Sequence, residues 1–563
     1  MDPFLIFSQP SQPTQPARRA PVTALAKRWA LPIALAIGLR MLTLTPGLPY
    51  IGYVDEGHVL HPTAELLRSG SWDPGWYGYP PLTFYLISSA AKGVDFVERA
   101  VTPGRSLVQE IPSRDEVYTP AGRLYDIVGP TDLIVTGRFV MLLLGVGTVL
   151  VSGLLGSALF GWRTGWVAAL MVACCPSFVH RGSLVMVDTP ATFFVTLALY
   201  LVARFRRPDR DIRDFLAQPA PVLAFGAGLA AALAAASKYS AVVVVPVAVA
   251  AVLAVAPTLS RATRTVLALG AGLLTGLTLG APTFALRWHE IVGALGMQAW
   301  LYGTYEVTPS YWRTAVQPYE LGVPLVLCAA AGLWQMLRRI DLRATAWTWL
   351  AFAALLTLPL LRFAFQPFRN LLPLCPLVAV AGAHFLVGSF ERPEGDRAAV
   401  SARWIGIVAG VAVALSFGVG ILRFHHSLVR RDSRVEAIDW LALRVQPGDQ
   451  VLVLRDLAIL PSEIRRLPAR TSVVTCKRLK KLAASAPSAY LVVGGPQGGS
   501  SARDGMVAGC APRSAASEIA SFGSVPTPLY SDSWRTNLEA IRILKTLDPA
   551  IDVDDATTRE NPR

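Results

Sequence analysis

The chain has little charge, because Asp, Glu, Lys and Arg make up only 16% of its 563 residues. Soluble domains usually carry about 25%. The deficit is uneven: residues 424–563 hold 34 charged residues (24%), whereas the preceding 423 residues hold 56 (13%). With 53% hydrophobic residues overall, the first three quarters cannot be an ordinary soluble domain, and a disordered chain or a coiled coil is also excluded. We predict a polytopic membrane protein with a soluble C-terminal part.

Cysteine is scarce as well, with six residues and no pair of CxxC motifs, which excludes a disulfide-stapled small protein and a zinc site of that spacing. Four cysteines lie in apolar runs and are expected to be inert packing residues. For the other two, Cys476 and Cys510, a disulfide and a pair of free thiols both remain open, and free thiols are favoured.

The net charge of +14 would favour nucleic acid as a partner if the protein were soluble. Here the Arg residues mostly lie between apolar runs, which membrane topology explains. We therefore expect membrane lipids around the chain and no nucleic acid. The segment GGPQGGS at 494–500 is interpreted as a flexible loop.

Long apolar runs are the dominant feature. A helix needs about 20 apolar residues to cross the hydrocarbon core of a bilayer. We predict an all-α membrane fold of about eleven transmembrane helices. Their expected ranges are 29–46, 139–162, 164–180, 189–203, 215–237, 239–260, 265–286, 321–337, 344–361, 370–390 and 404–422.

Charge bias indicates the topology. Four cationic residues between Arg18 and Arg28 precede the first span, so the N-terminus is expected to be cytoplasmic. Residues 82–98 are amphipathic and carry Lys92 and Asp95. If this segment crossed the membrane, the later Arg-rich connections would face outward, against the rule. We predict an interfacial helix over 82–98, within a first external loop at 47–137.

The predicted organisation has four parts. A disordered cytoplasmic tail (1–28) precedes the transmembrane domain (29–423), and a small external α/β domain (424–545) precedes a disordered tail (546–563). The short apolar runs at 451–454, 472–474 and 490–493 have strand character, and the segment at 433–445 has helical spacing. The C-terminal domain is expected on the periplasmic or extracellular side of the inner or plasma membrane.

Ionisable residues gather on the outer side in this topology. Asp55 and Glu56 follow the first span, Asp188 begins the fourth, Lys238 lies between the fifth and sixth, and Arg369 precedes the tenth. Charged groups at mid-membrane cost roughly 2.5–3.5 kcal/mol each, so their convergence suggests a site. Structural roles stay open for the same residues. Asp55 and Glu56 could stabilise the start of a helix, and Asp188 could be an N-cap. Lys238 and Arg369 could extend to the membrane surface.

The residue types suit group transfer to or from a phosphate. A carboxylate such as Asp55 can deprotonate a hydroxyl or amine, and with His58 and Asp188 it could hold a divalent metal cation. Packing is an alternative role for that histidine. Arg and Lys suit a phosphate, the former bidentately and the latter as a point charge. Aromatic residues in WYGYPPLTF (76–84), Tyr79 among them, could line a sugar or lipid pocket, although the two prolines also fit a helix start.

An ordered set of motifs resembles the GT-C glycosyltransferases, specifically glycosyltransferase family 39 in the broad sense, with its protein O-mannosyltransferases and lipid A aminoarabinose transferases. The motifs are YVDEGHVLHPTAELLRSG followed by GYPPLTFYL, then GRFVMLLLGVGTVLVSGLLGSALFGWRTGWVAALMVACCPSFV and VDTP, then AASKYSAVVVVP, FRNLLPLCPLVAVAGA and DSRVEAIDWLALRVQPGDQVLV. Together they cover residues 29 to about 455.

The resemblance implies a GT-C fold and a polyprenyl-phosphate sugar donor, with transfer to a lipid, glycan or protein acceptor on the outer face. Asp55 matches the family's first-loop acid, the base towards the acceptor, and Glu56 matches the second acid of the mannosyltransferase pair. Asp188 matches the acid of the second external loop, while Lys238 and Arg369 lie where cations could hold the lipid phosphate. The family often has an aromatic residue where this sequence has His58, which leaves a metal requirement open.

The implied reaction is a direct displacement at the anomeric carbon with inversion. Three other functions stay open. A different lipid-linked glycan polymerase or ligase would use a similar site. A secondary transporter would place ionisable residues near mid-membrane and show inverted repeats, which the sequence does not display. A non-catalytic scaffold would need none of these acids. Neither the sugar nor the acceptor can be read from the residues.

Overall fold

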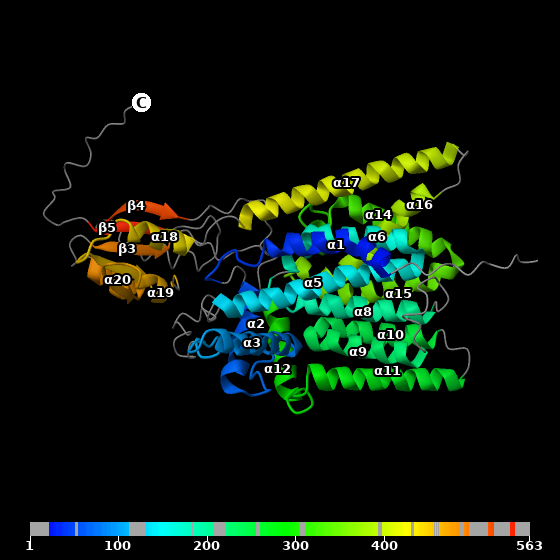
Figure 1. The fold of residues 1–563 in the computed structure, drawn as a ribbon, viewed down its shortest axis with the longest axis horizontal. Coiled ribbons are helices and arrows are strands. Elements are labelled where there is room, and N and C mark those ends of the chain that lie inside the picture. Colours follow the sequence, from blue (N-terminus) through cyan, green and yellow to red (C-terminus); the bar gives the residue numbers. More distant parts are fainter. Residues whose placement is uncertain are drawn as a thin grey trace, which may run out of the picture.

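The computed structural model describes residues 22–50, 54–111, 131–182, 184–206, 220–254, 259–304, 310–391, 397–428, 433–454, 457, 459, 461–483, 489–494, 516–522 and 541–546. The chain is mostly helical (Figure 1). The predicted tails lie largely outside these residues, as do Cys510 and the loop at 495–500. The predicted disulfide alternative therefore stays a prediction.

Each of the eleven apolar runs contains helix, but some bounds differ from the predicted ranges: the helix of the first run ends at Met41, and that of the run at 265–286 ends at Gly280. The first part of the chain contains α1 (Val22–Met41), α2 (Val54–Ser69), α3 (Leu82–Val101), α5 (Thr131–Phe160), α6 (Trp162–Cys174), α7 (Pro176–Arg181), α8 (Asp188–Arg206), α9 (Ala220–Ser237), η1 (Tyr239–Val243), α10 (Val244–Leu253) and α11 (Leu259–Gly280). The next part contains α12 (Trp288–Thr304), α13 (Tyr311–Ala315), α14 (Val323–Arg338), α15 (Ile340–Thr357), η2 (Leu358–Arg362), η3 (Phe368–Leu374), α16 (Cys375–Phe390) and α17 (Arg397–Leu428).

The number of transmembrane helices is not confirmed as eleven. In the described part of the chain, six helical segments are long and apolar enough to cross a membrane: Thr131–Phe160, Ala220–Ser237, Ala262–Gly280, Ile340–Arg362, Phe368–Phe390 and Ala399–His425. Two shorter apolar segments are Tyr239–Leu253 and Val323–Arg338. Breaks explain part of the difference. For example, the run at 164–180 divides into α6 and α7 because Pro176 cannot continue the hydrogen bonding of α6.

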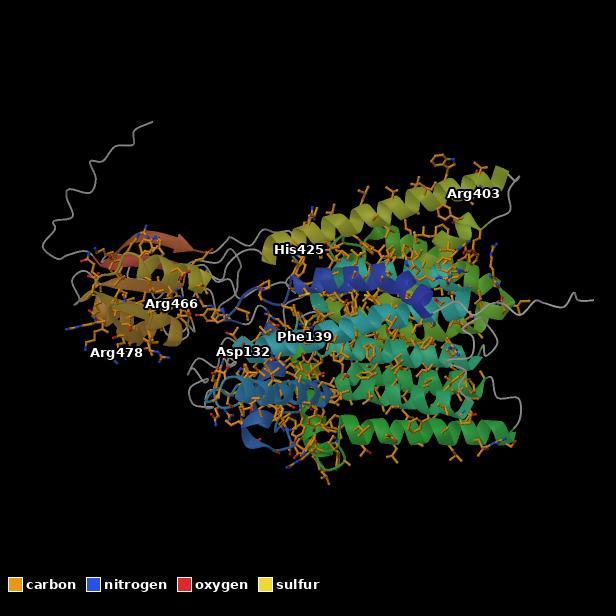
Figure 2. The ribbon with its side chains drawn as sticks, in the orientation of Figure 1. Asp132, Phe139, Arg403, His425, Arg466 and Arg478 are labelled. Carbon is orange, nitrogen blue, oxygen red and sulfur yellow. The ribbon has the colours of Figure 1, made fainter. Side chains whose placement is uncertain are left out.

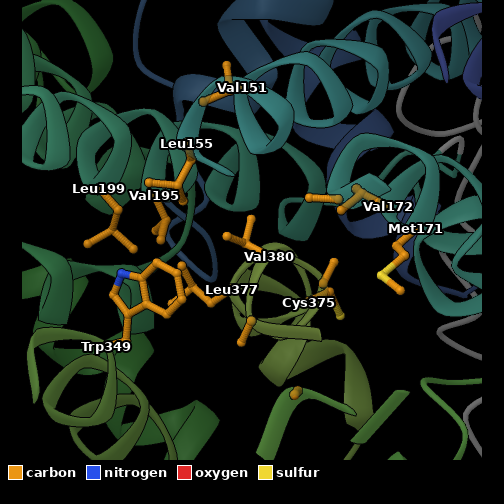
Figure 3. Packing of buried hydrophobic residues seen from close by; sticks show 14 of the residues in the cluster. Val151, Leu155, Met171, Val172, Val195, Leu199, Trp349, Cys375, Leu377 and Val380 are labelled. Carbon is orange, nitrogen blue, oxygen red and sulfur yellow. The ribbon is translucent and has the colours of Figure 1, made fainter. Parts of the chain in front are cut away.

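Helix α16 lies at the centre of the bundle, and 67% of the residues in its candidate span are buried. Figure 3 shows Cys375, Leu377 and Val380 of this helix surrounded by side chains of α5, α6, α8 and α15. The 3-10 helix η3 leads directly into α16. The side chains of η3 are therefore held at the start of a well-buried helix of the bundle.

Helices α11 and α17 lie at opposite edges of the bundle (Figure 1), and only 22% of each candidate span is buried. Large apolar side chains such as Val408 and Leu415 on α17 are 64% and 66% exposed. Figure 2 labels Arg403 and His425 towards the two ends of α17, so its polar residues flank the apolar stretch. An exposed apolar surface with polar ends is what contact with lipid requires.

Helices α2, α3 and α12 lie at one end of the bundle, which we call the loop end (Figure 1). The predicted helix over 82–98 is observed as α3, with Leu82–Val101 as its bounds. Its Asp95 accepts hydrogen bonds from Ser106 Oγ (2.6 Å) and the backbone N–H of Val108 (3.2 Å), and it pairs with Arg99 (2.8 Å). This acid therefore anchors the chain that follows α3.

The C-terminal part contains a five-stranded sheet with strand order β2-β1-β3-β5-β4. Strand β1 pairs in parallel with β2 and β3, whereas β5 is antiparallel to β3 and β4. Alternate residues of β1 pack on opposite faces, Val451 and Val453 with α18 residues and Leu452 with Leu479 of α20. The bounds are α18 (Ser433–Ala442), β1 (Gln450–Leu454), α19 (Pro461–Ile464), β2 (Arg470–Val474), α20 (Cys476–Ala483), β3 (Tyr490–Gly494), β4 (Ala516–Phe522) and β5 (Ile541–Thr546).

Candidate active site at the loop end

Asp55 and Glu56 lie in the first turn of α2, as the helix-start interpretation predicts, and both are buried (8% and 0% exposed). The positive end of the helix dipole favours acids at this position. Consecutive helical residues point about 100° apart, so the two carboxylates contact different elements. The structure thus separates two residues that the sequence presents as one pair.

Glu56 is held in a buried ion pair with Arg138 of α5. The Nε and Nη2 atoms of Arg138 donate to the two carboxylate oxygens at 2.9 and 2.8 Å, and the backbone N–H of Val185 donates at 3.2 Å. The remaining Arg138 nitrogen, Nη1, donates to the carbonyls of Leu44 and Pro46 (2.9 and 2.8 Å). Because Glu56 and Arg138 are 0% and 1% exposed, this pair is built into the interior.

Asp55 pairs with Arg369 of η3. The two side chains come from positions 314 residues apart, and they are 12% and 11% exposed. Unlike the Glu56–Arg138 pair, this one is reachable from solvent. A carboxylate beside a guanidinium and close to water is a group that can exchange its partner.

Asp188 is the first residue of α8, and its carboxylate pairs with Lys238 at 2.5 Å. Lys238 lies between α9 and η1 in an extended conformation (φ −148°, ψ 129°) that ends one helix before the next begins. Its ammonium also donates to Asn370 Oδ1 at 2.8 Å, and Asn370 Nδ2 donates to the Tyr311 hydroxyl at 3.1 Å.

The two acid–cation pairs meet at η3, because Arg369 and Asn370 are consecutive residues. One pairs with Asp55 and the other accepts a hydrogen bond from Lys238. Four residues proposed from the sequence are therefore brought to one short segment at the head of α16. The acids come from two different loops, and the cations belong to two others.

A second buried ion pair supports this arrangement. Arg181 of α7 donates to both oxygens of Glu320, at 2.5 and 2.7 Å, and these side chains are 4% and 0% exposed. The backbone carbonyl of Arg181 accepts a hydrogen bond from Thr189, next to Asp188. Its guanidinium lies 5.7 Å from the ring of Phe368, next to Arg369. The pair thus connects the segments that carry the two acid–cation pairs.

Aromatic rings lie beside Asp55. His58 stacks on Trp76 with ring centres 5.8 Å apart, and Tyr79 contacts both rings edge-on at 6.4 and 5.5 Å. Burial lowers the pKa of His58 to about 4, so its imidazole is neutral at pH 7. Tyr79, the predicted substrate contact, therefore belongs to a group of rings that includes His58, one turn after Asp55 in α2, and the faces of such rings suit a sugar or a lipid.

A polar cluster ties the segment after α2 to α12. Asp73 pairs with Arg287 at 3.0 Å and accepts a hydrogen bond from the Tyr77 hydroxyl at 2.6 Å. Burial raises the pKa of Asp73, but the hydrogen bonds from Tyr77 and from the backbone N–H of Gly75, together with Arg287, lower it overall. Arg287 also pairs with Glu290 of α12 at 3.2 Å, so the cluster holds α12 to the segment after α2.

The predicted metal set of Asp55, His58 and Asp188 is not assembled. Within the residues that the structure describes, no three His, Cys, Asp or Glu side chains are grouped so that they could hold a metal ion. Each acid is paired with a cation, and the histidine is stacked on Trp76. These residues therefore do not fit a metal centre.

Several residues of the site were not predicted from the sequence. Arg138 lies one residue before the apolar run that predicts α5, and Glu320 lies one residue before another. Asn370 stands beside a predicted residue, and Tyr311 falls in a segment with no recognisable pattern. For Arg138 and Glu320, the sequence shows a charged residue at the edge of an apolar run. Such residues are common, and the sequence does not show which residue each of them pairs with. Burial raises the pKa of Tyr311 to about 12, so it is a proton donor at pH 7.

Comparison with known proteins supports the sequence resemblance. The family model described as dolichyl-phosphate-mannose-protein mannosyltransferase matches residues 127–286. This range contains Arg138, Asp188 and Lys238, but neither Asp55 nor Arg369. No curated protein matches the chain.

Solved structures share the fold. The crystal structure of ArnT from Cupriavidus metallidurans bound to undecaprenyl phosphate is 14% identical, with 97% of this chain and 100% of that chain covered and a TM-score of 0.52. Its apo state is 15% identical, with 92% and 98% covered and a TM-score of 0.51. The Archaeoglobus fulgidus oligosaccharyltransferase in the apo form is 12% identical, with 83% and 69% covered and a TM-score of 0.48. The chain has the fold of GT-C membrane glycosyltransferases and resembles glycosyltransferase family 39, the family of the matched mannosyltransferase model.

Proposed function

We propose that this protein is an inverting glycosyltransferase. It transfers a sugar from a polyprenyl-phosphate donor to a lipid, glycan or protein acceptor at the outer face of the inner or plasma membrane. One observation carries the proposal: two acids and two cations from separate loops meet at Arg369 and Asn370, at the head of the central helix. Such a set contains both a base for an acceptor and cations for a phosphate leaving group.

In this proposal the loop end of the bundle faces outward. The sheet lies beyond that same end (Figure 1), and Arg434 of α18 packs over the ring of Tyr50 at 3.7 Å. The C-terminal part and the candidate site are therefore on one side.

Asp55 acts as the base. It lies at the solvent-reachable edge of the site, beside the rings of His58, Trp76 and Tyr79, where a sugar can stack. As the acceptor oxygen or nitrogen attacks the anomeric carbon, Asp55 takes its proton. Glu56 holds the start of α2 in place through its buried ion pair with Arg138. Because no oxygen of Glu56 is exposed, we assign it a positioning role instead of a second base.

Lys238, Arg369 and Asn370 bind the phosphate of the donor. Charge develops on the phosphate oxygen as the bond to the sugar breaks, and fixed cations stabilise that charge most strongly in a site shielded from water. Asp188 orients Lys238, and Tyr311 orients Asn370 through a hydrogen bond of 3.1 Å. Among the described residues, the Tyr311 O–H donates to no acceptor, so it is available to a phosphate oxygen.

The test is sugar transfer by Asp55→Asn. Membranes that contain the protein receive undecaprenyl phosphate carrying a hexose or a pentose, and mass spectrometry measures the release of undecaprenyl phosphate. We expect the Asp55→Asn rate to fall by about 10²–10⁴-fold, the range for loss of a general base. The matched control is Asp132→Asn, an acid at the start of α5 that is 39% exposed and pairs with Arg105 (Figure 2). Full activity of Asp55→Asn at normal expression would contradict the proposal.

A further inference from the structure

The charges of the candidate site balance without any substrate. Asp55 pairs with Arg369, and Asp188 pairs with Lys238, which makes two acids for two cations. The cations proposed to hold the lipid phosphate are therefore already in contact with carboxylates. A donor that carries a phosphodiester brings one further negative charge. It cannot pair fully with these cations unless at least one carboxylate gives way.

We infer that Asp55 occupies, in the resting protein, the place at Arg369 that a phosphate oxygen of the donor takes. This inference rests on the proposed function. Carboxylate and phosphate oxygens use the same donor geometry of a guanidinium group, so one can replace the other at the same nitrogen atoms. The ligand that displaces Asp55 is a lipid phosphate, and its binding frees the base.

The exposure of the pairs identifies the one that exchanges. Asp55 and Arg369 are 12% and 11% exposed, whereas Glu56 and Arg138 are 0% and 1% exposed. Arg138 also donates to two backbone carbonyls, so a phosphate has no room and no free donor there. Asp188 is only 4% exposed and lies behind Lys238, whose side chain is 12% exposed. Asp188 therefore stays in place while Lys238 reaches the phosphate.

The reaction follows a simple charge balance. The acceptor O–H or N–H bond breaks and its proton goes to Asp55, while the acceptor atom forms a bond to the anomeric carbon. The electron pair of the bond between that carbon and the phosphate oxygen stays on the phosphate, which gains one negative charge. Protonated Asp55 no longer competes for Arg369, and the full cation is then available to the departing phosphate. One arginine thereby couples proton removal to departure of the leaving group.

The experiment measures binding of undecaprenyl phosphate without a sugar to the purified full-length protein in detergent at pH 7.5. If Asp55 competes for Arg369, its removal strengthens binding. We expect Asp55→Asn to bind the lipid phosphate about 10-fold more tightly than the wild type, which corresponds to about 1.4 kcal/mol. The control Asp132→Asn removes one negative charge from the same end of the protein, and we expect its affinity to stay within about 2-fold of the wild type.

Each outcome decides one question. Binding by the wild type together with equal or weaker binding by Asp55→Asn overturns the inference and leaves the proposed function standing. Absence of binding by the folded wild type contradicts the proposed function itself. A second measurement serves if Asp55→Asn does not fold: carbodiimide labelling of Asp55 in the wild type, followed by peptide mass spectrometry. We expect faster labelling of Asp55 when undecaprenyl phosphate is added, and an unchanged rate overturns the inference.

Discussion

The ion pairs at the loop end fall into two groups that use the same residue types differently. Glu56–Arg138 and Arg181–Glu320 are at most 4% exposed, bidentate, and satisfied by further hydrogen bonds. Asp55–Arg369 is more exposed, and Lys238 has a third hydrogen position beyond its bonds to Asp188 and Asn370. The buried pairs cannot exchange partners without leaving a charge unpaired, whereas Asp55 can leave Arg369, and Lys238 can bind a further partner while it keeps Asp188.

This comparison shows why adjacent acids differ in role. Asp55 and Glu56 occupy the same helical turn, yet only the first is positioned to meet a substrate. Burial converts an acid–cation pair into a structural link, because the cost of separating two charges in a low-dielectric interior is high. Partial exposure keeps the pair available for chemistry. Residue type alone therefore does not distinguish support from catalysis.

The largest expected effect is on stability and comes from breaking a buried pair. Arg138→Met leaves the carboxylate of Glu56 buried without its cation, and we expect a loss of about 3–5 kcal/mol in the free energy of unfolding. Thermal unfolding in detergent measures this loss. The control Arg339→Met removes an arginine that pairs with Asp341 at 3.1 Å and is 52% exposed, and it should cost less than about 1 kcal/mol. Similar losses for both variants would contradict the distinction between the two groups of pairs.

A site pair should affect the reaction more than the fold. Lys238→Met removes one cation from the proposed phosphate site, and we expect the transfer rate to fall by about 10²–10³-fold, as for other removed transition-state donors. Its unfolding temperature should fall less than that of Arg138→Met, because the site is open to water at the Lys238 side chain. Initial rates and thermal unfolding of the same preparation test both statements. A rate within 3-fold of the wild type would remove Lys238 from the mechanism.

The smallest expected effect concerns pH and the histidines of α2. Burial lowers the pKa of His58 to about 4 and, together with His58 and Arg68, that of His61 to about 4, from an ordinary value of 6.5. Between about pH 4 and pH 6.5, these histidines bind more protons in the unfolded chain than in the folded protein. Stability is therefore complete above about pH 6.5 and is lost as the pH falls towards 4, by about 1–2 kcal/mol per histidine at pH 5.

Unfolding temperatures between pH 7.5 and pH 4.5 measure this dependence. The variant His58→Phe keeps an aromatic ring against Trp76 and removes the titrating group, so its unfolding temperature should fall less between these pH values. An identical pH profile for wild type and variant would show that His58 does not contribute. The comparison also separates the neutral histidines of α2 from the charged acids one turn away.

Most of the architecture could be predicted from the sequence because a bilayer imposes a simple requirement. Apolar runs of sufficient length must become helices, and each of the eleven runs contains helix among its described residues. The number of helices that cross the membrane could not be predicted as well. A proline at the start of α7 divides one predicted run at a point where a count of apolar residues continues.

The residues of the candidate site could be proposed from the sequence, but the ion pairs that they form could not. Asp55, Asp188, Lys238 and Arg369 were proposed because polar residues are costly beside apolar spans. Their arrangement as two pairs, joined by Arg369 and Asn370, depends on the packing of η3 and α16 against helices that are distant in sequence. Glu56 looked like a second catalytic acid because the sequence does not show that Arg138, 82 residues away, contacts it.

The sequence alone determined that this chain is a membrane protein, that each long apolar run contains helix, and which acids and cations lie beside those runs. These features follow from local composition, since transfer of side chains between water and lipid depends on each segment separately. Only the tertiary structure decided which acid meets which cation and which of those pairs remain open to water. Burial and pairing are properties of segments brought together from far apart, and no single segment contains them.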